Sequence, residues 1–245
     1  MRVYGLIGYP LSHSFSSAYF NNKFKVSKIH DTVYENFQLA NIDSLPLLIK
    51  SNNSISGLNV TIPYKESVIS YLDEIDPIVK KVGAVNTILV NNKRLIGYNT
   101  DVKGFEKSFF KESIKNRKIL ILGSGGASKA VQYVLSEKNI PYLVVSRNSS
   151  NDSFIEYSSV KQYINEYSII INTTPVGSYP ESESCPEIPY NLLSDKHFLF
   201  DLIYNPEKSK FLSLGENAGA KIKNGYEMLI MQAEESWKIW NKTHI

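Results

Sequence analysis

A glycine-rich turn between a buried strand and a helix is the feature that most constrains the fold of this chain. The segment KILILGSGGASKAVQYVL (118–135) opens with the apolar run ILIL, turns at Gly123, Gly125 and Gly126, and continues with apolar residues at helical spacing. In this setting Gly123 allows a tight turn, and Gly125 lets a pyrophosphate approach the backbone N–H groups that begin the helix. The segment therefore predicts a dinucleotide-binding α/β unit. A glycine turn that only permits close packing is the alternative, because Ser128 stands at the third position of GxGxxG.

The following strand indicates which dinucleotide is bound. NAD-binding units commonly place Asp or Glu on the ribose hydroxyls about 20 residues after the glycines. Here the strand PYLVVSR (141–147) has Ser146 near that place and Arg147 after it. With no carboxylate to repel a 2′-phosphate and a guanidinium to pair with it, the pattern favours NADP. An exposed arginine at a strand end is the alternative.

Short β-branched runs alternate with helical patterns along the whole chain, which predicts an α/β fold with mainly parallel sheets and covered faces. The expected strands are 2–8, 32–39, 55–63, 117–123, 141–147, 168–174 and 198–204, with a hairpin over 84–100 and helices over 16–25, 42–50, 126–138 and 225–240.

Composition excludes several classes of protein. With 245 residues, 42% of them hydrophobic and 21% charged, the chain has an ordinary globular composition with enough length for one or two cores. No apolar segment is long enough to span a bilayer, and the first residues, MRVYGLIGYP, reach Gly and Pro too soon for a signal peptide. We therefore expect a cytoplasmic protein. The single cysteine, Cys185, excludes an internal disulfide and reads as a loop thiol.

Charge and histidine spacing give no support for a nucleic-acid or metal partner. The net charge is only +3 and the lysines are scattered, so nucleic-acid binding has no support in the sequence. The histidines are far apart and show no metal-ligand spacing. We expect a small-molecule substrate, with no nucleic acid, membrane or metal ion as a partner.

One lysine occupies an unusual place. In NVTIPYKESV (59–68), Thr61 and Pro63 are typical of a helix start, which puts Lys65 in the first helical turn. A cation meets the positive end of the helix dipole there, so the placement is mildly unfavourable. Lys65 is either a solvated surface lysine or a group placed to exchange a proton near neutral pH.

Taken in order, these segments resemble the shikimate dehydrogenase family. GYPLSHSFS is similar to the N-terminal substrate signature of that family, and NVTIPYK to the segment with its catalytic lysine. GAVNT, GYNTD, GSGGAS, NTTPVG, DLIYNP and GYEMLIMQA follow in the family's order, so the match spans nearly the whole chain. Two places depart from the pattern. Ser17 replaces the proline of HSxSP, and Ser146-Arg147-Asn148 replaces Asn-Arg-Thr, with Asn151 where a second basic residue is expected.

The resemblance implies a role for residues in each motif. Lys65 and Asp101 would be catalytic and act as a coupled pair, with Lys65 as general base or as a hydrogen-bond donor to the alkoxide. The residues implied to contact the substrate are Ser14, Ser16, Thr61, Asn86, Tyr204 and Gln232. The residues implied to hold NADP are Gly123, Ser124, Gly125, Gly126, Ala127, Ser146, Arg147, Asn172, Thr173, Gly225 and Met228.

Ordinary structural roles are open to several of these residues. Ser14 and Ser16 would also serve as caps for the helix near residue 16. Asn86 and Asn99 would also serve as polar groups of the hairpin, and Gln232 as an exposed position on the last helix.

The resemblance also implies two domains that face each other across a cleft. Residues 1–101 with 226–245 would form the substrate-binding and catalytic domain, with the C-terminal helix returning to it, and residues 102–225 a Rossmann-like NADP-binding domain. The implied reaction is the reversible NADPH-dependent reduction of 3-dehydroshikimate to shikimate, in chorismate and aromatic amino acid biosynthesis, by a monomer or a homodimer. The alternatives are an NAD-dependent quinate/shikimate dehydrogenase, disfavoured by the missing acid near Ser146, and an inactive nucleotide-binding protein, disfavoured by Lys65 and Asp101.

Overall fold

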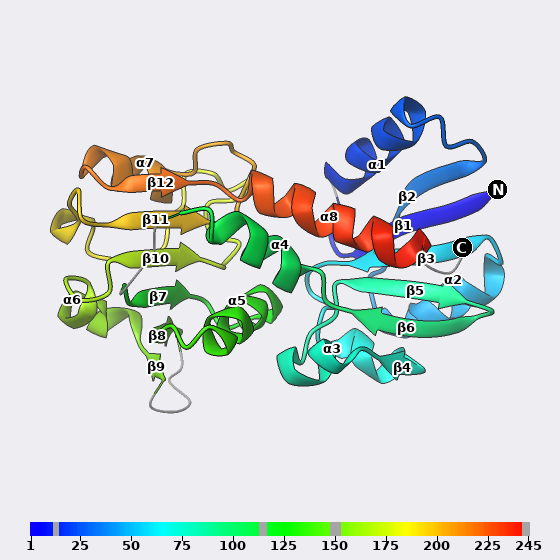
Figure 1. The fold of residues 1–245 in the computed structure, drawn as a ribbon, viewed down its shortest axis with the longest axis horizontal. Coiled ribbons are helices and arrows are strands. Elements are labelled where there is room, and N and C mark those ends of the chain that lie inside the picture. The colour runs from blue at the N-terminus through cyan, green and yellow to red at the C-terminus, as the bar shows by residue number, and fades with distance from the viewer. Residues whose placement is uncertain (12–14, 113–116, 148–152, 242–245) are drawn as a thin grey trace. The chain divides into compact units, whose positions relative to one another are not determined.

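A computed structural model describes residues 1–11, 15–112, 117–147 and 153–241 and divides the chain into two compact units (Figure 1). Unit 1 comprises Met1–Thr100 and Ala233–Ile245, and unit 2 comprises Asp101–Gln232. The last helix, α8 (Tyr226–Asn241), thus begins in unit 2 and ends in unit 1. No helix in the described part of the chain is long and apolar enough to cross a membrane.

Unit 1 is built on a mixed sheet with the strand order β2-β1-β3-β5-β6-β4. β1 pairs in parallel with β2 and β3, whereas the hairpin of β5 and β6 begins antiparallel to β3. Its turn residues, Asn92 and Lys93, have φ of 48° and 66°, the left-handed pair that a two-residue hairpin turn requires. The hairpin predicted over 84–100 is confirmed. The strands are β1 (Arg2–Gly8), β2 (Thr32–Gln38), β3 (Ile55–Val60), β4 (Glu74–Ile75), β5 (Thr87–Asn91) and β6 (Arg94–Tyr98).

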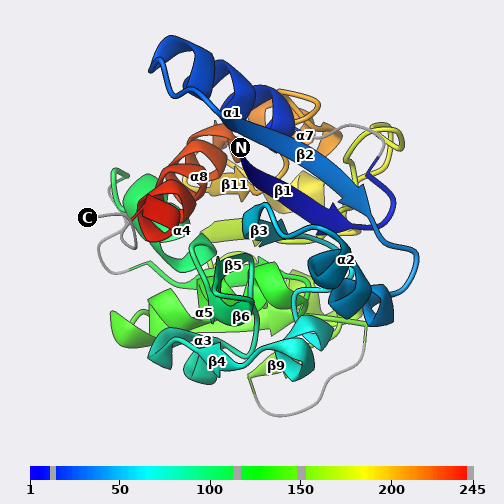
Figure 2. The same ribbon diagram turned by 90° about the vertical axis from the view of Figure 1, so that its right-hand side faces the viewer.

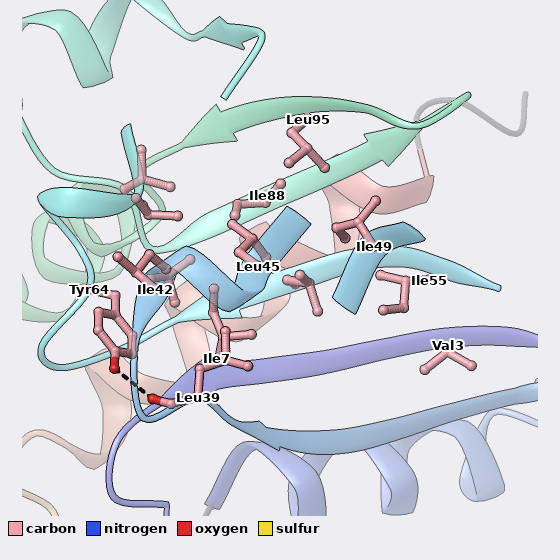
Figure 3. Close-up of a cluster of buried hydrophobic side chains, with 14 of the residues drawn as sticks. Val3, Ile7, Leu39, Ile42, Leu45, Ile49, Ile55, Tyr64, Ile88 and Leu95 are labelled. Atoms are coloured by element: carbon pink, nitrogen blue, oxygen red, sulfur yellow. Dashed lines mark hydrogen bonds between the residues drawn. The ribbon is translucent and has the colours of Figure 1, made fainter. Parts of the chain in front are cut away.

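Helical segments cover both faces of this sheet. Alternate residues of β1 enter two different cores: Val3 and Ile7 face α2, whereas Tyr4 and Leu6 face α1 and the end of α8 (Figure 2). Figure 3 shows the first of these cores, in which the hydroxyl of buried Tyr64 donates to the backbone oxygen of Leu39 at 2.6 Å. The helical segments are α1 (Phe15–Val26), η1 (Ile42–Ser44), α2 (Leu45–Ser51), η2 (Ser67–Tyr71) and α3 (Pro77–Val82).

The segment after β3 differs from the sequence prediction. The backbone N–H of Tyr64 donates to the oxygen of Thr61 at 2.9 Å, which closes a turn that contains the cis peptide bond Ile62–Pro63. Helical structure begins only with the 3₁₀ helix η2 at Ser67. The prediction that Lys65 lies in the first turn of a helix is therefore wrong, and a helix dipole does not explain its placement.

Unit 2 is built on a sheet whose described strands all pair in parallel, in the order β12-β11-β10-β7-β8-β9. This is the doubly wound Rossmann order. Strands are added to one side of β7 as far as β9, and then to its other side from β10 onward. Such a reversal opens a ligand crevice outside the carboxyl ends of β7 and β10. The strands are β7 (Ile119–Leu122), β8 (Tyr142–Val145), β9 (Phe154–Ile155), β10 (Ile169–Asn172), β11 (Phe198–Asp201) and β12 (Lys221–Lys223).

Both faces of this second sheet are covered, so β7, β10 and β11 are buried along their whole length. On one face Phe105 and Phe109 of α4 stack on Phe200 of β11. The other face holds Leu120, Ile170 and residues of α6 and α7. The helical segments are α4 (Asp101–Phe109), α5 (Gly126–Glu137), η3 (Tyr157–Ser159), α6 (Val160–Tyr163), η4 (Tyr190–Leu192) and α7 (Lys210–Asn217).

Candidate active site

Three of the predicted site residues lie at one edge of the unit 1 sheet, where β1 and β3 end and the antiparallel β5 begins. Thr61 follows β3, and its backbone N–H donates to the oxygen of Ile7 at 2.9 Å. The oxygen of Asn86 accepts from the N–H of Val60 at 2.8 Å, and the oxygen of Lys65 accepts from the N–H of Val85 at 2.7 Å. Backbone pairing thus places Thr61, Lys65 and Asn86 in adjacent segments. The side chain of Lys65 is half-buried.

Side-chain hydrogen bonds fix the segment that leads to Asp101. The backbone N–H of Thr100 donates to Oδ1 of Asn86 at 2.7 Å, and Nδ2 of Asn86 donates to Oγ1 of Thr100 at 2.9 Å. Nδ2 of Asn99 donates to the oxygen of Ala84 at 2.8 Å. Asn86 and Asn99 therefore have the structural role that the sequence left open. Substrate contact by Asn86 stays a prediction.

A buried cluster of hydroxyl and amide groups lies beside this segment, and the sequence reasoning missed it. Oγ of Ser236, on α8, is 2.8 Å from Oγ1 of Thr87 and 3.1 Å from Oγ1 of Thr100, and it accepts from Nδ2 of Asn59 at 3.0 Å. All four residues are at most 5% exposed. One signal was available: Ser236 lies three residues from Ala233 and four from Trp240, on the apolar side of the last helix.

The cluster continues to Ser16 through a buried tyrosine. The hydroxyl of Tyr34 donates to Oδ1 of Asn59 at 2.8 Å, and the side chain of Ser16 bonds to the same hydroxyl. Burial raises the pKa of Tyr34, and the bond from Ser16 acts in the opposite direction. Ser16 is thus tied to the same polar cluster as Thr100. The other predicted substrate serine, Ser14, lies outside the described residues.

In unit 2 the glycine turn has the shape that a pyrophosphate needs. Gly123 has a φ of 101°, and a Cβ there would lie 2.7 Å from Cγ2 of Thr174, so both backbone and packing require glycine. A Cβ on Gly125, by contrast, would meet nothing within 4 Å. The turn therefore has an open backbone face where α5 begins at Gly126, next to Ala127, and free helix N–H groups favour an anion there.

Two further observations bear on this turn. Ser128, at the third position of the pattern, is buried and accepts a hydrogen bond from Nε2 of Gln132 at 2.9 Å, so the helix accommodates its hydroxyl. The hydroxyls of Ser124 and Ser146 are 3.3 Å apart, which links the turn to the end of β8. These residues fit a dinucleotide phosphate.

Arg147 lies just past the end of β8, with an exposed side chain. Its charge acts on half-buried Tyr157: burial raises the pKa of that phenol, and Arg147 lowers it to a lesser extent. An exposed guanidinium at this strand end is available to a 2′-phosphate. Asn148 and Asn151, which depart from the family pattern, lie outside the described residues.

At the end of β10 the side chain of Asn172 has partners within unit 2. The amide of Asn172 is fully buried; Nδ2 donates to Oδ1 of Asp201 at 3.0 Å, and Oδ1 accepts from the backbone N–H of Thr174 at 3.0 Å. These internal partners give the Asn172 side chain a positioning role, and its contact with the cofactor stays a prediction. Thr173 is anchored to the turn, because its N–H and Oγ1 both donate to the oxygen of Leu122, at 3.0 and 2.6 Å.

The remaining predicted residues surround the start of α8 and the end of β11. A Cβ on Gly225 would collide with the backbone of Leu202, so close packing explains that glycine. Met228 is 6% exposed. Gln232 is half-buried and donates from Nε2 to the oxygen of Leu229 at 3.0 Å, within its own helix. Tyr204 is half-buried after β11.

In the described residues, no group of three or more His, Cys, Asp or Glu side chains could hold a metal ion.

The Rossmann strand order, with a glycine turn open at a helix start, defines unit 2 as a dinucleotide-binding unit, and unit 1 carries polar groups at its strand ends. Together they are the architecture of a dinucleotide-dependent enzyme.

The family model of the shikimate dehydrogenase substrate binding domain matches residues 6–88. Shikimate dehydrogenase (NADP(+)) of Clostridium beijerinckii is 40% identical over 257 residues, which cover 100% of this chain and 94% of that protein.

Solved structures of shikimate dehydrogenases are also similar to this chain. A crystal structure of shikimate dehydrogenase 1 from Peptoclostridium difficile has a TM-score of 0.88 and 38% identity, covering 99% of this chain and 92% of that one. A shikimate dehydrogenase crystallised in complex with NADP+ has a TM-score of 0.87 and 32% identity, covering 99% and 90%. The chain belongs to the shikimate dehydrogenase family. The resemblance read from the motifs and the two-domain α/β fold are confirmed.

Proposed function

We propose that this chain catalyses the reversible reduction of 3-dehydroshikimate to shikimate with NADPH, in chorismate and aromatic amino acid biosynthesis. The observation that carries the proposal is 40% identity, over the full chain, with a protein named for this activity and for NADP+. The protein is an NADP-dependent oxidoreductase that acts on a CH–OH group. We place it in the cytoplasm as a monomer or homodimer with a small-molecule substrate.

The cofactor would be held by the carboxyl edge of the unit 2 sheet. The open backbone of Gly125 and the first N–H groups of α5 would bind the pyrophosphate, because this face has room and a favourable dipole. The Arg147 guanidinium would pair with the 2′-phosphate, which selects NADP over NAD. When bound, NADPH supplies the hydride.

The substrate has one carboxylate and three hydroxyl groups, and unit 1 offers neutral donors and acceptors for them. Ser14 and Ser16 would receive the carboxylate through hydroxyl donors. Thr61 and Asn86 would bind ring hydroxyls, and both lie at the sheet edge where Lys65 is anchored. The family resemblance adds Tyr204 and Gln232 to the predicted substrate contacts.

Reduction of the ketone adds a hydride to carbon and a proton to oxygen, which gives the secondary alcohol. The Lys65 ammonium would donate that proton, or a hydrogen bond to the developing alkoxide, and Asp101 would position it or share its proton. In the oxidative direction the same pair receives the proton. The bond from Val85 to the backbone oxygen of Lys65 fixes where this side chain begins, and the helix dipole does not contribute.

A cofactor-reduction assay tests this function. The purified protein is mixed with shikimate, quinate or no substrate, each with NADP and with NAD, and formation of reduced nicotinamide is followed. Substrate-dependent reduction of NADP by shikimate is expected. Faster turnover with NAD and quinate would replace the proposal with a quinate/shikimate dehydrogenase. NADP binding without turnover on any substrate would favour an inactive nucleotide-binding protein.

A further inference from the structure

A buried carboxylate at the end of β11 has no part in the proposed chemistry, yet it joins three segments of unit 2. Asp201 has no exposed surface. Its Oδ1 accepts from Nδ2 of Asn172 and from the backbone N–H of Ile203, both at 3.0 Å, and its Oδ2 accepts from the hydroxyl of Ser209. One carboxylate thus connects the end of β10, the turn after β11 and the start of α7.

The chemistry of Asp201 fixes the orientation of Asn172. An ionised carboxylate only accepts hydrogen bonds, so Asn172 has to present its NH₂ group to Asp201. The Oδ1 atom of Asn172 then faces the other way, where it accepts from both the backbone N–H of Thr174, at 3.0 Å, and Oγ1 of Thr174, at 2.7 Å. In the opposite orientation the Asn172 oxygen would face the acceptor oxygen of Asp201, and its NH₂ group would face the N–H donor of Thr174.

Thr174, which Asn172 holds in place, contacts the dinucleotide turn. Its Cγ2 atom would lie 2.7 Å from a Cβ at Gly123, so the threonine methyl lies directly over the first residue of the turn. Its neighbour Thr173 donates twice to the oxygen of Leu122, the last residue of β7. These contacts lie at the carboxyl ends of β7 and β10, where the strand order reverses and doubly wound sheets bind their ligand.

We propose that Asp201 is a positioning residue for the dinucleotide-binding turn, acting through Asn172 and Thr174 on Gly123. The proposal rests on the proposed function, because it assumes that the turn binds NADP. Burying a carboxylate among neutral partners is unfavourable, and burial raises the pKa of Asp201 to about 6 although its three hydrogen bonds act in the opposite direction.

The test compares NADPH dissociation constants for four variants, measured from nicotinamide fluorescence without substrate. Asp201→Ala should raise the Kd about tenfold to a hundredfold, because the amide of Asn172 loses its orienting partner. Thr174→Val keeps the methyl contact but removes the Oγ1 donor, and should raise the Kd about threefold to tenfold. Asp201→Asn retains an Oδ1 acceptor for Asn172 and Ile203, and should stay within about threefold of the parent protein.

Ser209→Ala is the matched control. It removes the bond to Oδ2, the carboxylate oxygen that does not face Asn172, and the side-chain cap of α7. It should lower Tm while the Kd for NADPH stays within about twofold. An equal loss of affinity in Ser209→Ala and Thr174→Val would show general destabilisation and overturn the proposal.

Unchanged affinity in both Asp201→Ala and Thr174→Val would also overturn it. If Asp201→Ala does not fold, Thr174→Val decides. A parallel shikimate assay separates the two proposals. Parent protein that binds NADPH but does not oxidise shikimate would overturn the proposed function, and the ratios of Kd would still decide the role of Asp201. Parent protein that does not bind NADPH would overturn both.

Discussion

Thr100 and Asn86 are joined by hydrogen bonds in both directions: the backbone N–H and Oγ1 of Thr100 donate to Oδ1 of Asn86, and Nδ2 of Asn86 donates to Oγ1 of Thr100. The pair ties the GAVNT segment to the GYNTD segment, and Asp101 follows directly as the first residue of α4. A substitution of Asn86 would therefore affect the placement of Asp101 as well as any contact that Asn86 makes with the substrate. Thr100 is also 3.1 Å from Ser236, which extends the same fixed arrangement to α8.

Ser236→Ala should destabilise the protein. The change removes the hydroxyl to which Asn59, Thr87 and Thr100 bond. A buried polar group left without its hydrogen-bond partner costs about 1–3 kcal/mol. The free energy of unfolding from urea denaturation measures the effect. Ser51→Ala is the control, because the Ser51 hydroxyl is exposed and donates to carbonyls of its own helix. It should change stability by less than about 0.5 kcal/mol. Equal effects would contradict a structural role for the buried cluster.

Arg147→Ala should weaken the binding of NADP far more than that of NAD. The exposed guanidinium follows a strand end that carries no acid, and one charge-assisted hydrogen bond contributes about 1.5–3 kcal/mol. The preference for NADP should fall by about tenfold to a hundredfold. Dissociation constants for both cofactors measure it. Arg94→Ala is the control, because Arg94 is also exposed but pairs with Glu74 in unit 1. Equal losses for NADP and NAD would make Arg147 a general contact.

Local patterns predicted the elements whose signals are contained in a short segment. The strand, glycine turn and helix over 118–135 appear as β7, Gly123 to Gly125 and α5, because an apolar run, a turn and a helical repeat follow each other directly. The hairpin is correct for the same reason. Helix α3 was missed although its signals were present: Asp76 caps it, Pro77 begins it and Gly83 ends it with a φ of 70°.

Long-range packing decided what local patterns could not. Thr61 and Pro63 are compatible with a helix start, but the segment forms a turn while the Tyr64 hydroxyl bonds to Leu39, far away in sequence. The structural role of Asn172 depends on Asp201, which lies on another strand. Ser236 could be placed on the apolar side of α8, but its partners come from three segments of unit 1. These contacts depend on the packed fold and not on neighbours in the chain.

Stability should depend on the protonation of Asp201. Its pKa is about 6 in the folded protein and 3.8 ordinarily, so the folded state keeps a proton that the unfolded chain has released. The protonated carboxyl therefore makes its full contribution to the free energy of unfolding below about pH 3.8. This contribution, at most about 3 kcal/mol, is lost as the pH rises through about 6. Asp201→Asn lacks this titration. The free energy of unfolding of the parent protein should therefore fall relative to that of the variant between about pH 4 and pH 6.

Urea denaturation at several pH values measures that difference. The charge of Asp201 also acts on Tyr190, whose pKa is raised chiefly by burial and then by Cys185. Tyr190 therefore titrates above this pH window and does not contribute. A difference between parent and variant that stays constant over this range would contradict the raised pKa of Asp201.

Lys65→Ala should lower kcat by about 10² to 10⁴, the usual contribution of a positioned acid–base group. Substrate binding should change far less, because the interaction is made mainly in the transition state. Stability should stay within about 0.5 kcal/mol, since Lys65 lies in a turn and its removal relieves no helix dipole. Lys80→Ala, which removes an exposed lysine of α3 in the same unit, should leave kcat unchanged.

Asp101→Asn should also be slow, and the double variant should lose much less than the sum of the two single losses, because groups that act as a unit are not additive. The decisive measurement is single-turnover reduction of 3-dehydroshikimate by the protein with NADPH already bound, since it isolates hydride and proton transfer from product release. A single-turnover rate in Lys65→Ala close to that of the parent protein would remove Lys65 from the chemical step and leave it as a half-buried lysine whose backbone, through its bond to Val85, holds the edge of the sheet together.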